Sequence, residues 1–154
     1  MSKILFVCLG NICRSPLAHG IAQQIAKERK LDLVVDSAGT SNWHEGEAPC
    51  TNSIRVAQLH SVDISTQQSR PINKQDVIHF KYVVAMDRQN KVDMEAFGFK
   101  HVYLLGDFGG YKGVDIADPW FFEGTDVMQS FEKVYTMVER CVEDFIIKVE
   151  NGSL

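Results

Sequence analysis

Residues 4–16 read ILFVCLGNICRSP. The first four form an unbroken apolar run, which is typical of a strand buried on both faces of a sheet. Gly10 and Asn11 tolerate the left-handed backbone angles that a tight loop requires. Ser15 is a favourable N-cap and Pro16 suits the first helical position. The stretch therefore predicts a strand, a tight loop and the start of a helix.

The rest of the chain alternates apolar runs with helical patterns. Apolar residues three or four positions apart mark the last helix, and Asp126 with Gln129 predicts a capping box at its start. Residues 106–124 are rich in glycine and predict a long loop. Alternating strands and helices predict one α/β domain over residues 1–154, with helices on both faces of a four-stranded parallel sheet. We expect further strands over residues 31–35, 82–86 and 102–105, and helices over residues 16–30, 51–60, 88–96 and 127–149.

Composition narrows the class of protein. Hydrophobic residues make up 45% of the 154 residues and charged residues 23%, as in an ordinary soluble globular domain. No apolar run approaches the roughly 20 residues that span a bilayer. The net charge is −4 and no cluster of Lys and Arg stands out, which disfavours nucleic-acid and membrane-surface binding. We expect a cytoplasmic monomer whose four cysteines are mostly reduced thiols.

The loop after the first strand carries the chemistry. Cys8 ends this strand, and ligands of open α/β sheets bind beyond such strand ends. The free N–H groups of the loop and the helix start could surround an anion, and the Arg14 fork matches two phosphate oxygens. The same surroundings stabilise a thiolate, which predicts a nucleophilic Cys8. The alternative is a buried strand-end cysteine followed by an ordinary turn.

Beyond these patterns, the run Val7–Pro16 resembles the signature loop of the low-molecular-weight protein tyrosine phosphatases. Asp118-Pro119-Trp120 resembles the late Asp-Pro-aromatic motif of that family, and residues 36–43 and Met86-Asp87 fit other segments. The likeness covers nearly the whole chain. It implies a three-layer α/β/α, Rossmann-like or flavodoxin-like fold with strand order 2-1-3-4.

The resemblance also implies a two-step hydrolysis of phosphotyrosine proteins and small aryl phosphates, with no metal and no cofactor. Cys8 would attack phosphorus to form a cysteinyl-phosphate. Asp118 would act first as general acid and then as general base. Trp43 and Trp120 would form walls around the substrate ring. Phosphate or another oxyanion would be bound by Leu9, Gly10, Asn11, Ile12, Cys13, Arg14 and Ser15.

Two further expectations concern the surroundings of the loop. The family supports its loop with an Asn, a Ser and a His; Asn11 and Ser37 are present, and Gln67 stands in for the His, with Gln68 as another possible alignment. His19 stands where the family has a Glu. The resemblance also implies that Cys13 pairs with Cys8 on oxidation and guards it. Cys50 and Cys141 are then structural.

Three other functions compete with this reading. An arsenate reductase on the same fold needs further relay cysteines, and the chain has none between Cys50 and Cys141. Protein-arginine phosphatases typically have Thr at the position of Ile12, so Ile12 favours phosphotyrosine. A non-catalytic phosphate-binding module would need neither a thiolate at Cys8 nor a distant acid at Asp118.

Overall fold

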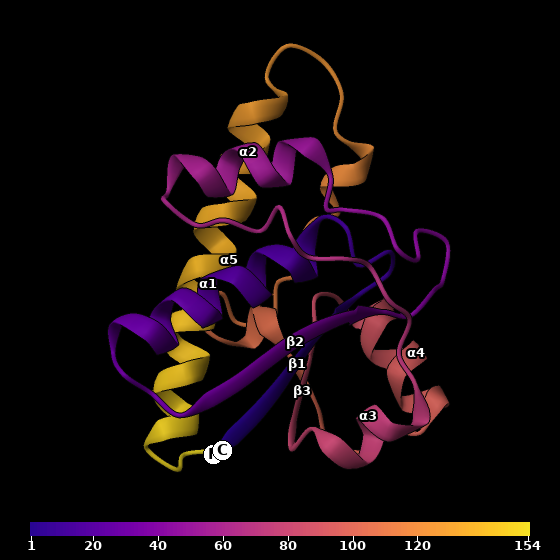
Figure 1. The fold of residues 1–154 in the computed structure, drawn as a ribbon, viewed down its shortest axis with the longest axis vertical. Helices are drawn as coiled ribbons and strands as arrows, with labels where there is room; N and C mark the ends of the chain where they lie inside the picture. The colour runs from indigo at the N-terminus through magenta and orange to yellow at the C-terminus, as the bar shows by residue number, and fades with distance from the viewer.

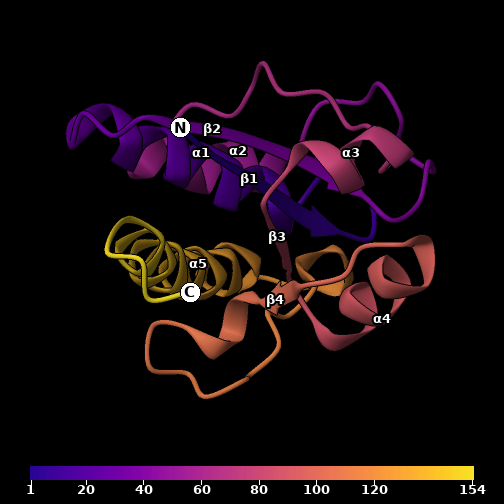
Figure 2. The same cartoon turned by 90° about the horizontal axis from the view of Figure 1, so that it is seen from below.

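Four parallel strands form the centre of the computed structural model, which describes residues 1–154. Their order is β2-β1-β3-β4, as the resemblance implied; Figure 1 labels the first three of these strands and Figure 2 all four. The strands are β1 (Ser2–Cys8), β2 (Leu33–Gly39), β3 (Tyr82–Ala85) and β4 (Val102–Leu104). The longest pairing joins β1 to β2 in register from Ser2 opposite Leu33 to Cys8 opposite Gly39, so both strands reach the same edge of the sheet.

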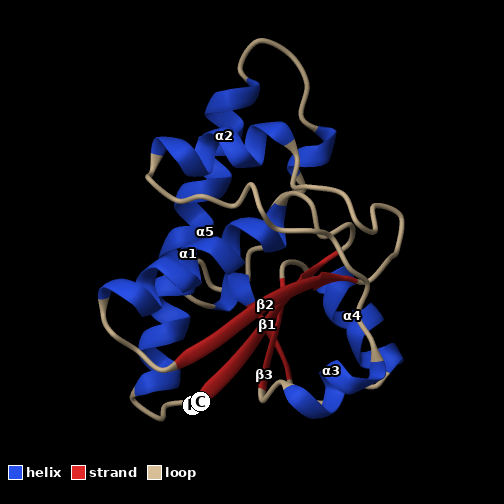
Figure 3. Cartoon of the chain, in the orientation of Figure 1, coloured by secondary structure: helices blue, strands red, loops and turns tan.

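Helices cover both faces of this sheet, which confirms the three-layer prediction (Figures 2 and 3). The first group, on one face, packs with the larger core and consists of α1 (Arg14–Glu28), α2 (Thr51–Leu59) and α5 (Val127–Glu150). The second group, on the other face, consists of α3 (Lys74–His79) and α4 (Arg88–Phe97). Two short 3-10 helices, η1 (Leu105–Asp107) and η2 (Pro119–Phe121), interrupt the long glycine-rich segment.

Strand β1 explains why two cores form. Its side chains alternate between the faces, as the twofold period of a strand requires. Ile4, Phe6 and Cys8 pack with α1, α2 and α5. Leu5 and Val7 pack in the smaller core beside α3 and α4. The uninterrupted apolar run in the sequence therefore reflects a central strand covered on both sides, and it places Cys8 at the strand end beneath α1.

Several element boundaries differ from the sequence-based expectations. Helix α1 begins at Arg14, and the Ser15 hydroxyl does not cap it because that hydroxyl contacts Cys8 and Asn11. Strand β2 extends to Gly39, since its pairing with β1 continues to that residue. The capping box expected at Asp126 is absent, although α5 begins at the next residue.

Helix α3 was not foreseen at all. It has six residues, too few to show a helical apolar period. Its signal is a capping box of Asn73 and Asp76, in which each side chain accepts from the backbone N–H of the other.

The loops at the carboxyl edge meet closely. A Cβ atom on Gly39 would lie 2.8 Å from the carbonyl oxygen of Leu9, so only glycine lets the end of β2 approach the loop after β1. None of the helices combines the length and the apolar character that crossing a membrane requires.

Candidate active site

The loop after β1 is held by five of its carbonyl groups, which point outward to neighbouring segments. The carbonyl oxygens of Cys8 and Leu9 accept from the backbone N–H groups of Thr40 and Ser41, at 2.9 and 3.1 Å. Neighbouring segments also bind the carbonyls of Gly10, Ile12 and Cys13. Ser69 Oγ donates to Gly10, the Cys50 N–H to Ile12, and Ser53 Oγ to Cys13.

The outward carbonyls determine where the N–H groups of the loop point. In a planar trans peptide, the N–H points opposite to the preceding C=O. The N–H groups of residues 9, 10, 11, 13 and 14 therefore point into the hollow that the loop surrounds. Such convergent donors, at the start of a helix, form a binding site for an anion.

Cys8 lies at the bottom of this hollow. Its sulfur lies 3.1 Å from Ser15 Oγ and accepts from the Asn11 backbone N–H at 3.2 Å. Ser15 Oγ already accepts a hydrogen bond from the Asn11 side-chain amide, so its own proton is free to point at the sulfur. The sulfur thus has two hydrogen-bonding partners from its own loop.

Asn11 ties the loop to its surroundings. Its backbone is left-handed, with φ of 56°, a conformation that Asn adopts more readily than most residues. Its amide nitrogen donates to both Ser15 Oγ and Ser37 Oγ, at 2.8 and 3.0 Å. Its amide oxygen accepts from the Arg70 backbone N–H at 3.0 Å. The side chain is buried with all its polar atoms paired, as a buried amide requires.

The histidine that reaches Ser37 comes from helix α1. His19 Nδ1 lies 3.0 Å from Ser37 Oγ, and burial, partly opposed by Asp36, lowers the pKa of His19. Gln67, which we expected to support the loop, instead donates to the carbonyl of Pro16 at 3.1 Å. Gln67 thus supports the first turn of α1, while a neutral His19 can accept the proton of the Ser37 hydroxyl.

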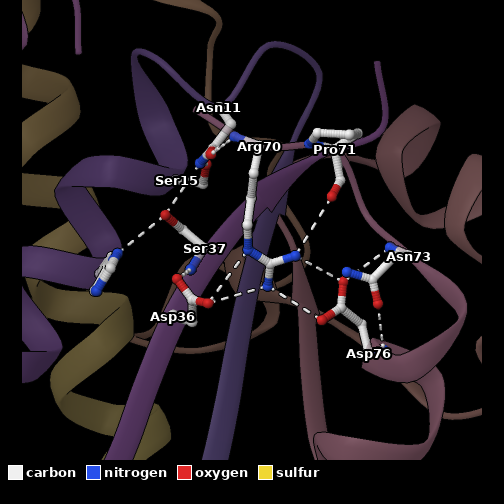
Figure 4. A network of polar contacts seen from close by, with 9 residues as sticks. Asn11, Ser15, Asp36, Ser37, Arg70, Pro71, Asn73 and Asp76 are labelled. Atoms are coloured by element: carbon white, nitrogen blue, oxygen red, sulfur yellow. Dashed lines mark hydrogen bonds and ion pairs between the residues drawn. The ribbon is translucent and has the colours of Figure 1, made fainter. Parts of the chain in front are cut away.

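Arg70 anchors the same region from the other side of β2 (Figure 4). Its guanidinium lies between two carboxylates and donates to Asp36 at 3.0 Å and to Asp76 at 2.9 and 3.1 Å. Burial alone would lower the pKa of Arg70, but the two carboxylates outweigh it and the pKa is raised. Arg70 therefore stays charged, and its backbone N–H holds the Asn11 oxygen in place.

Arg14 is buried beside the hollow, with 2% of its surface exposed. Its Nη1 donates to Asp87 at 2.6 Å and to the carbonyl of Ile116 at 2.9 Å. Burial by itself lowers the pKa of Arg14, but the charge of ionised Cys8, the hydrogen bond that Arg14 donates to Asp87 and the charges of Asp118 and Asp87 raise it above its ordinary value. Both hydrogen bonds use Nη1, so the other guanidinium N–H groups remain available to an anion.

Asp118 faces Arg14 across the hollow. Its Oδ2 lies 3.5 Å from Arg14 Nη2, and its Oδ1 accepts from the Trp120 backbone N–H at 3.0 Å. The structure thus brings Asp118 into one cavity with Cys8, although the sequence separates them widely. The cavity measures about 280 Å³ and is lined by Cys8, Leu9, Gly10, Ile12, Cys13, Arg14, Trp43, His44, Asp118, Trp120 and Phe121.

Aromatic side chains surround the mouth of this cavity. Trp43 and Trp120, the two expected wall residues, both line it and remain 69% and 57% exposed. His44 also lines it, with its ring centroid 5.2 Å from that of Trp120 and its Nδ1 2.9 Å from a Glu47 oxygen. Phosphate-loop residues Asn11 and Ser15 do not line the cavity, because they lie buried beneath its floor.

The cysteines are paired differently from the expectation. A disulfide joins Cys13 to Cys50, whereas Cys8 and Cys141 are free. The structure thus holds no Cys8–Cys13 bond, and the pairing of these two on oxidation stays a prediction, while two of the four cysteines expected to be mostly thiols form a disulfide. The reason is positional: Cys50 at the start of α2 has its Cα 5.6 Å from that of Cys13, within the usual range for a disulfide.

Comparisons with known proteins agree with this geometry. Residues 3–153 match the model of the low molecular weight phosphotyrosine protein phosphatase family. The phosphatase of that name from Sus scrofa is 32% identical over 96% of this chain and 95% of its own. The chain belongs to this family.

Solved structures of related phosphatases have the same fold as this chain. A protein tyrosine phosphatase from Entamoeba histolytica superposes with a TM-score of 0.91 at 30% identity and covers both chains fully. A Drosophila arginine phosphatase gives 0.88 at 32% identity, over 96% of this chain and 97% of its own. The phosphatase fold is thus retained across the whole chain.

Within this family fold, sequence reasoning missed three residues of the site. Asp87 holds Arg14, and His19 supports Ser37. His44 lines the cavity beside Trp120. Asp87 had a usable signal, because it follows β3 at the sheet edge where Cys8 lies. His19 stood out only as a departure from the family's Glu, and His44 gave no signal, since only the folded chain shows which neighbours they meet.

Proposed function

We propose that this phosphatase hydrolyses phosphotyrosine in proteins through a cysteinyl-phosphate on Cys8. The observation that carries the proposal is the meeting of three groups in one cavity: the Cys8 sulfur, the Arg14 guanidinium and the Asp118 carboxyl. The sulfur is the nucleophile, the guanidinium stabilises negative charge on the phosphoryl oxygens, and the carboxyl donates a proton. Transfer of a phosphoryl group from an aryl ester requires these three functions.

In the first step the phosphate enters the hollow and its oxygens meet the inward N–H groups and Arg14. The Cys8 thiolate attacks phosphorus in line with the departing phenolic oxygen, so the S–P bond forms as the P–O bond breaks. A phenol has a pKa near 10 and leaves poorly as an anion. Asp118, in its protonated form, gives its proton to that oxygen.

In the second step Asp118, now ionised, takes a proton from water. The water attacks phosphorus, the S–P bond breaks, and the electron pair returns to Cys8. The Ser15 hydroxyl, 3.1 Å from the sulfur, stabilises the departing thiolate. The inward N–H groups hold the phosphoryl oxygens in both steps, because the backbone is fixed by its outward carbonyls.

The substrate side chain is an aryl group rather than a short alcohol. Trp43, Trp120 and Phe121 provide flat apolar surface at the cavity mouth, which suits an aromatic ring. Phosphoarginine is the second candidate, because the similar Drosophila protein is named an arginine phosphatase. Ile12 lines the cavity as a bulky apolar residue and favours the ring over a guanidinium. We also expect a cytoplasmic monomer that accepts inorganic phosphate and other oxyanions.

A panel of phosphopeptides tests the proposal. We expect the reduced full chain to hydrolyse phosphotyrosine peptides much faster than phosphoarginine or phosphoserine peptides, and to show no turnover of arsenate to arsenite. Cys8→Ser should abolish hydrolysis while inorganic phosphate still binds in calorimetry. Near-full activity of Cys8→Ser would contradict the mechanism. A preference for phosphoarginine would instead retain the mechanism and change the substrate.

A further inference from the structure

A disulfide lies directly beside the free nucleophile. Cys13 is bonded to Cys50, while Cys8 keeps its own hydrogen-bond partners. Cys8 and Cys13 line the same cavity, and Cys50 is not among the lining residues. Cys13 therefore lies between two other cysteines: Cys8 lines the cavity with it, and Cys50 lies behind the loop. Because Cys50 lies behind the loop, the bond to Cys13 leaves the cavity open.

Cys50 is held near Cys13 independently of the disulfide. Its backbone N–H donates to the carbonyl of Ile12 at 2.8 Å, and Ser53 Oγ donates to the carbonyl of Cys13 at 3.1 Å. Cys50 Sγ lies 3.2 Å from the Ile12 carbonyl oxygen, so a reduced thiol also has an acceptor. The two sulfurs therefore remain within reach of each other when the bond is reduced.

We propose that Cys50 is a resolving thiol that accepts the oxidised state of the nucleophile through Cys13 and returns Cys8 to its active form. The substrate of this second activity is the site's own Cys8 after oxidation by a peroxide. The inference rests on the proposed role of Cys8 as nucleophile. A disulfide in a protein expected in a reducing compartment is more often a transient redox bond than a structural one.

Each step balances. A peroxide oxidises the Cys8 thiolate: the O–O bond breaks, an S–O bond forms, and water or an alcohol leaves. The Cys13 thiolate attacks the Cys8 sulfur, the S–O bond breaks, and hydroxide leaves as water once protonated. The Cys50 thiolate then attacks the Cys13 sulfur, so the Cys13–Cys50 bond forms and Cys8 departs with the electron pair. Cys13 and Cys50 have together supplied the two electrons that reduce the peroxide.

The surroundings of Cys8 favour the last exchange, in which Cys50 attacks Cys13 and Cys8 leaves. A thiolate that is well stabilised leaves faster in thiol–disulfide exchange. Cys8 leaves into contacts with Ser15, the Asn11 N–H and the charge of Arg14, whereas the Cys50 sulfur lies 3.2 Å from the Ile12 carbonyl oxygen and 3.7 Å from Ser53 Oγ. Cys50 is also partly exposed, while Cys8 and Cys13 are 3% and 4% exposed. An external thiol can therefore reduce the bond at Cys50 without reaching the nucleophile.

A peroxide pulse on the reduced full chain tests the transfer. We expect activity toward an aryl phosphate to fall with hydrogen peroxide and to return after catalase removes the peroxide, with no thiol reductant added. Trypsin leaves Cys8 and Cys13 in one peptide, Ile4–Arg14, and Cys50 in Leu31–Arg55. The disulfide should therefore first lie within Ile4–Arg14 and then link the two peptides through Cys13, in step with the return of activity.

Cys50→Ser should lose activity to the same extent and recover it only after dithiothreitol. Cys141→Ser changes a buried free cysteine of α5 that does not line the cavity, so it is the matched control and should recover like the natural chain. Recovery of Cys50→Ser without reductant, or an Ile4–Arg14 disulfide that persists in the natural chain, would overturn the inference. The peptide time course on the natural chain needs no variant to fold. A reduced chain without any phosphatase activity would instead contradict the proposed function.

Discussion

The phosphate loop and the segment that carries Asp118 are held in very different ways. In the phosphate loop, neighbouring segments bind the carbonyls, and buried Asn11 has every polar atom of its side chain paired. The Asp118 carboxyl accepts one hydrogen bond, from the next residue but one, and meets Arg14 at 3.5 Å. Its neighbours Trp120 and Phe121 are largely exposed.

This difference follows from what each region has to do. The loop stabilises charge on a phosphoryl group, and such stabilisation is strongest when the donors are fixed before the reaction. Asp118 has to meet a substrate ring that enters and leaves the cavity. A segment with few contacts at the cavity mouth allows this exchange. Substitutions in the loop should therefore affect both stability and catalysis, whereas substitutions at Asp118 should affect catalysis alone.

The largest effect is expected at Arg14. Arg14→Lys keeps the charge but loses the fork held by Asp87 and Ile116. We expect kcat/KM for an aryl phosphate to fall about 1000-fold, the scale of arginines that stabilise phosphoryl transfer. Steady-state kinetics and phosphate calorimetry measure the loss. Arg88→Lys, an exposed arginine on α4, is the control. Unchanged phosphate affinity in Arg14→Lys would contradict a role of the Arg14 guanidinium in binding phosphate.

Asp118→Asn should cost about 100-fold in kcat, the lower range for a general acid, but only with poor leaving groups. Aryl phosphates whose rings carry electron-withdrawing groups should lose much less. The melting temperature should change little, because the one hydrogen bond of the carboxyl stays within its own segment and its contact with Arg14 is a longer ion pair of 3.5 Å. Asp126→Asn, an exposed carboxylate of the same segment, is the control. An equal loss for all leaving groups would remove Asp118 from the acid role.

Asn11→Gly isolates the amide of the loop, since glycine keeps the left-handed backbone. The three lost contacts, to Ser15, Ser37 and Arg70, should lower the free energy of unfolding by about 1–3 kcal/mol. Activity should fall as well, because Ser15 is no longer oriented toward Cys8. Urea unfolding compares this variant with exposed Asn42→Gly. A stable Asn11→Gly with reduced activity would show that the loop does not depend on this network for its stability.

The smallest effect is expected at His19 and depends on pH. Burial lowers the pKa of His19 from its ordinary 6.5, although Asp36 opposes this and Arg70 adds to it. Below pH 6.5 the unfolded chain binds a proton that the folded chain resists, so stability falls as pH decreases through this range. His19→Gln should remove this slope, and exposed His101→Gln should retain it. Equal slopes of the unfolding free energy in both variants would contradict the neutral His19.

The sequence predicted the sheet and the loop, and the three catalytic candidates Cys8, Arg14 and Asp118 meet in one cavity, because each depends on local chemistry or on a motif. The run before Cys8 and the stripe of α5 are such local signals. The support under the loop was harder to foresee. Gln67 lay at the expected position, yet His19 reaches Ser37, since a helix and a strand from different parts of the chain decide that contact.

The disulfide was missed for a related reason. The family resemblance implies that Cys13 pairs with Cys8, and it says nothing of Cys50. Only the packing of α2 against the loop places Cys50 beside Cys13, through backbone contacts with Ile12 and Cys13. A single sequence has no pattern that indicates a contact between two cysteines far apart in the chain.

The central claim is that Cys8 receives the phosphoryl group. Rapid mixing with an aryl phosphate, denaturation within the first turnover and tryptic mapping test it most directly. We predict one phosphoryl group on Ile4–Arg14, placed on Cys8 by fragmentation and absent from Cys8→Ala. Turnover without any phosphorylated peptide, or with the group on another residue, would contradict the account.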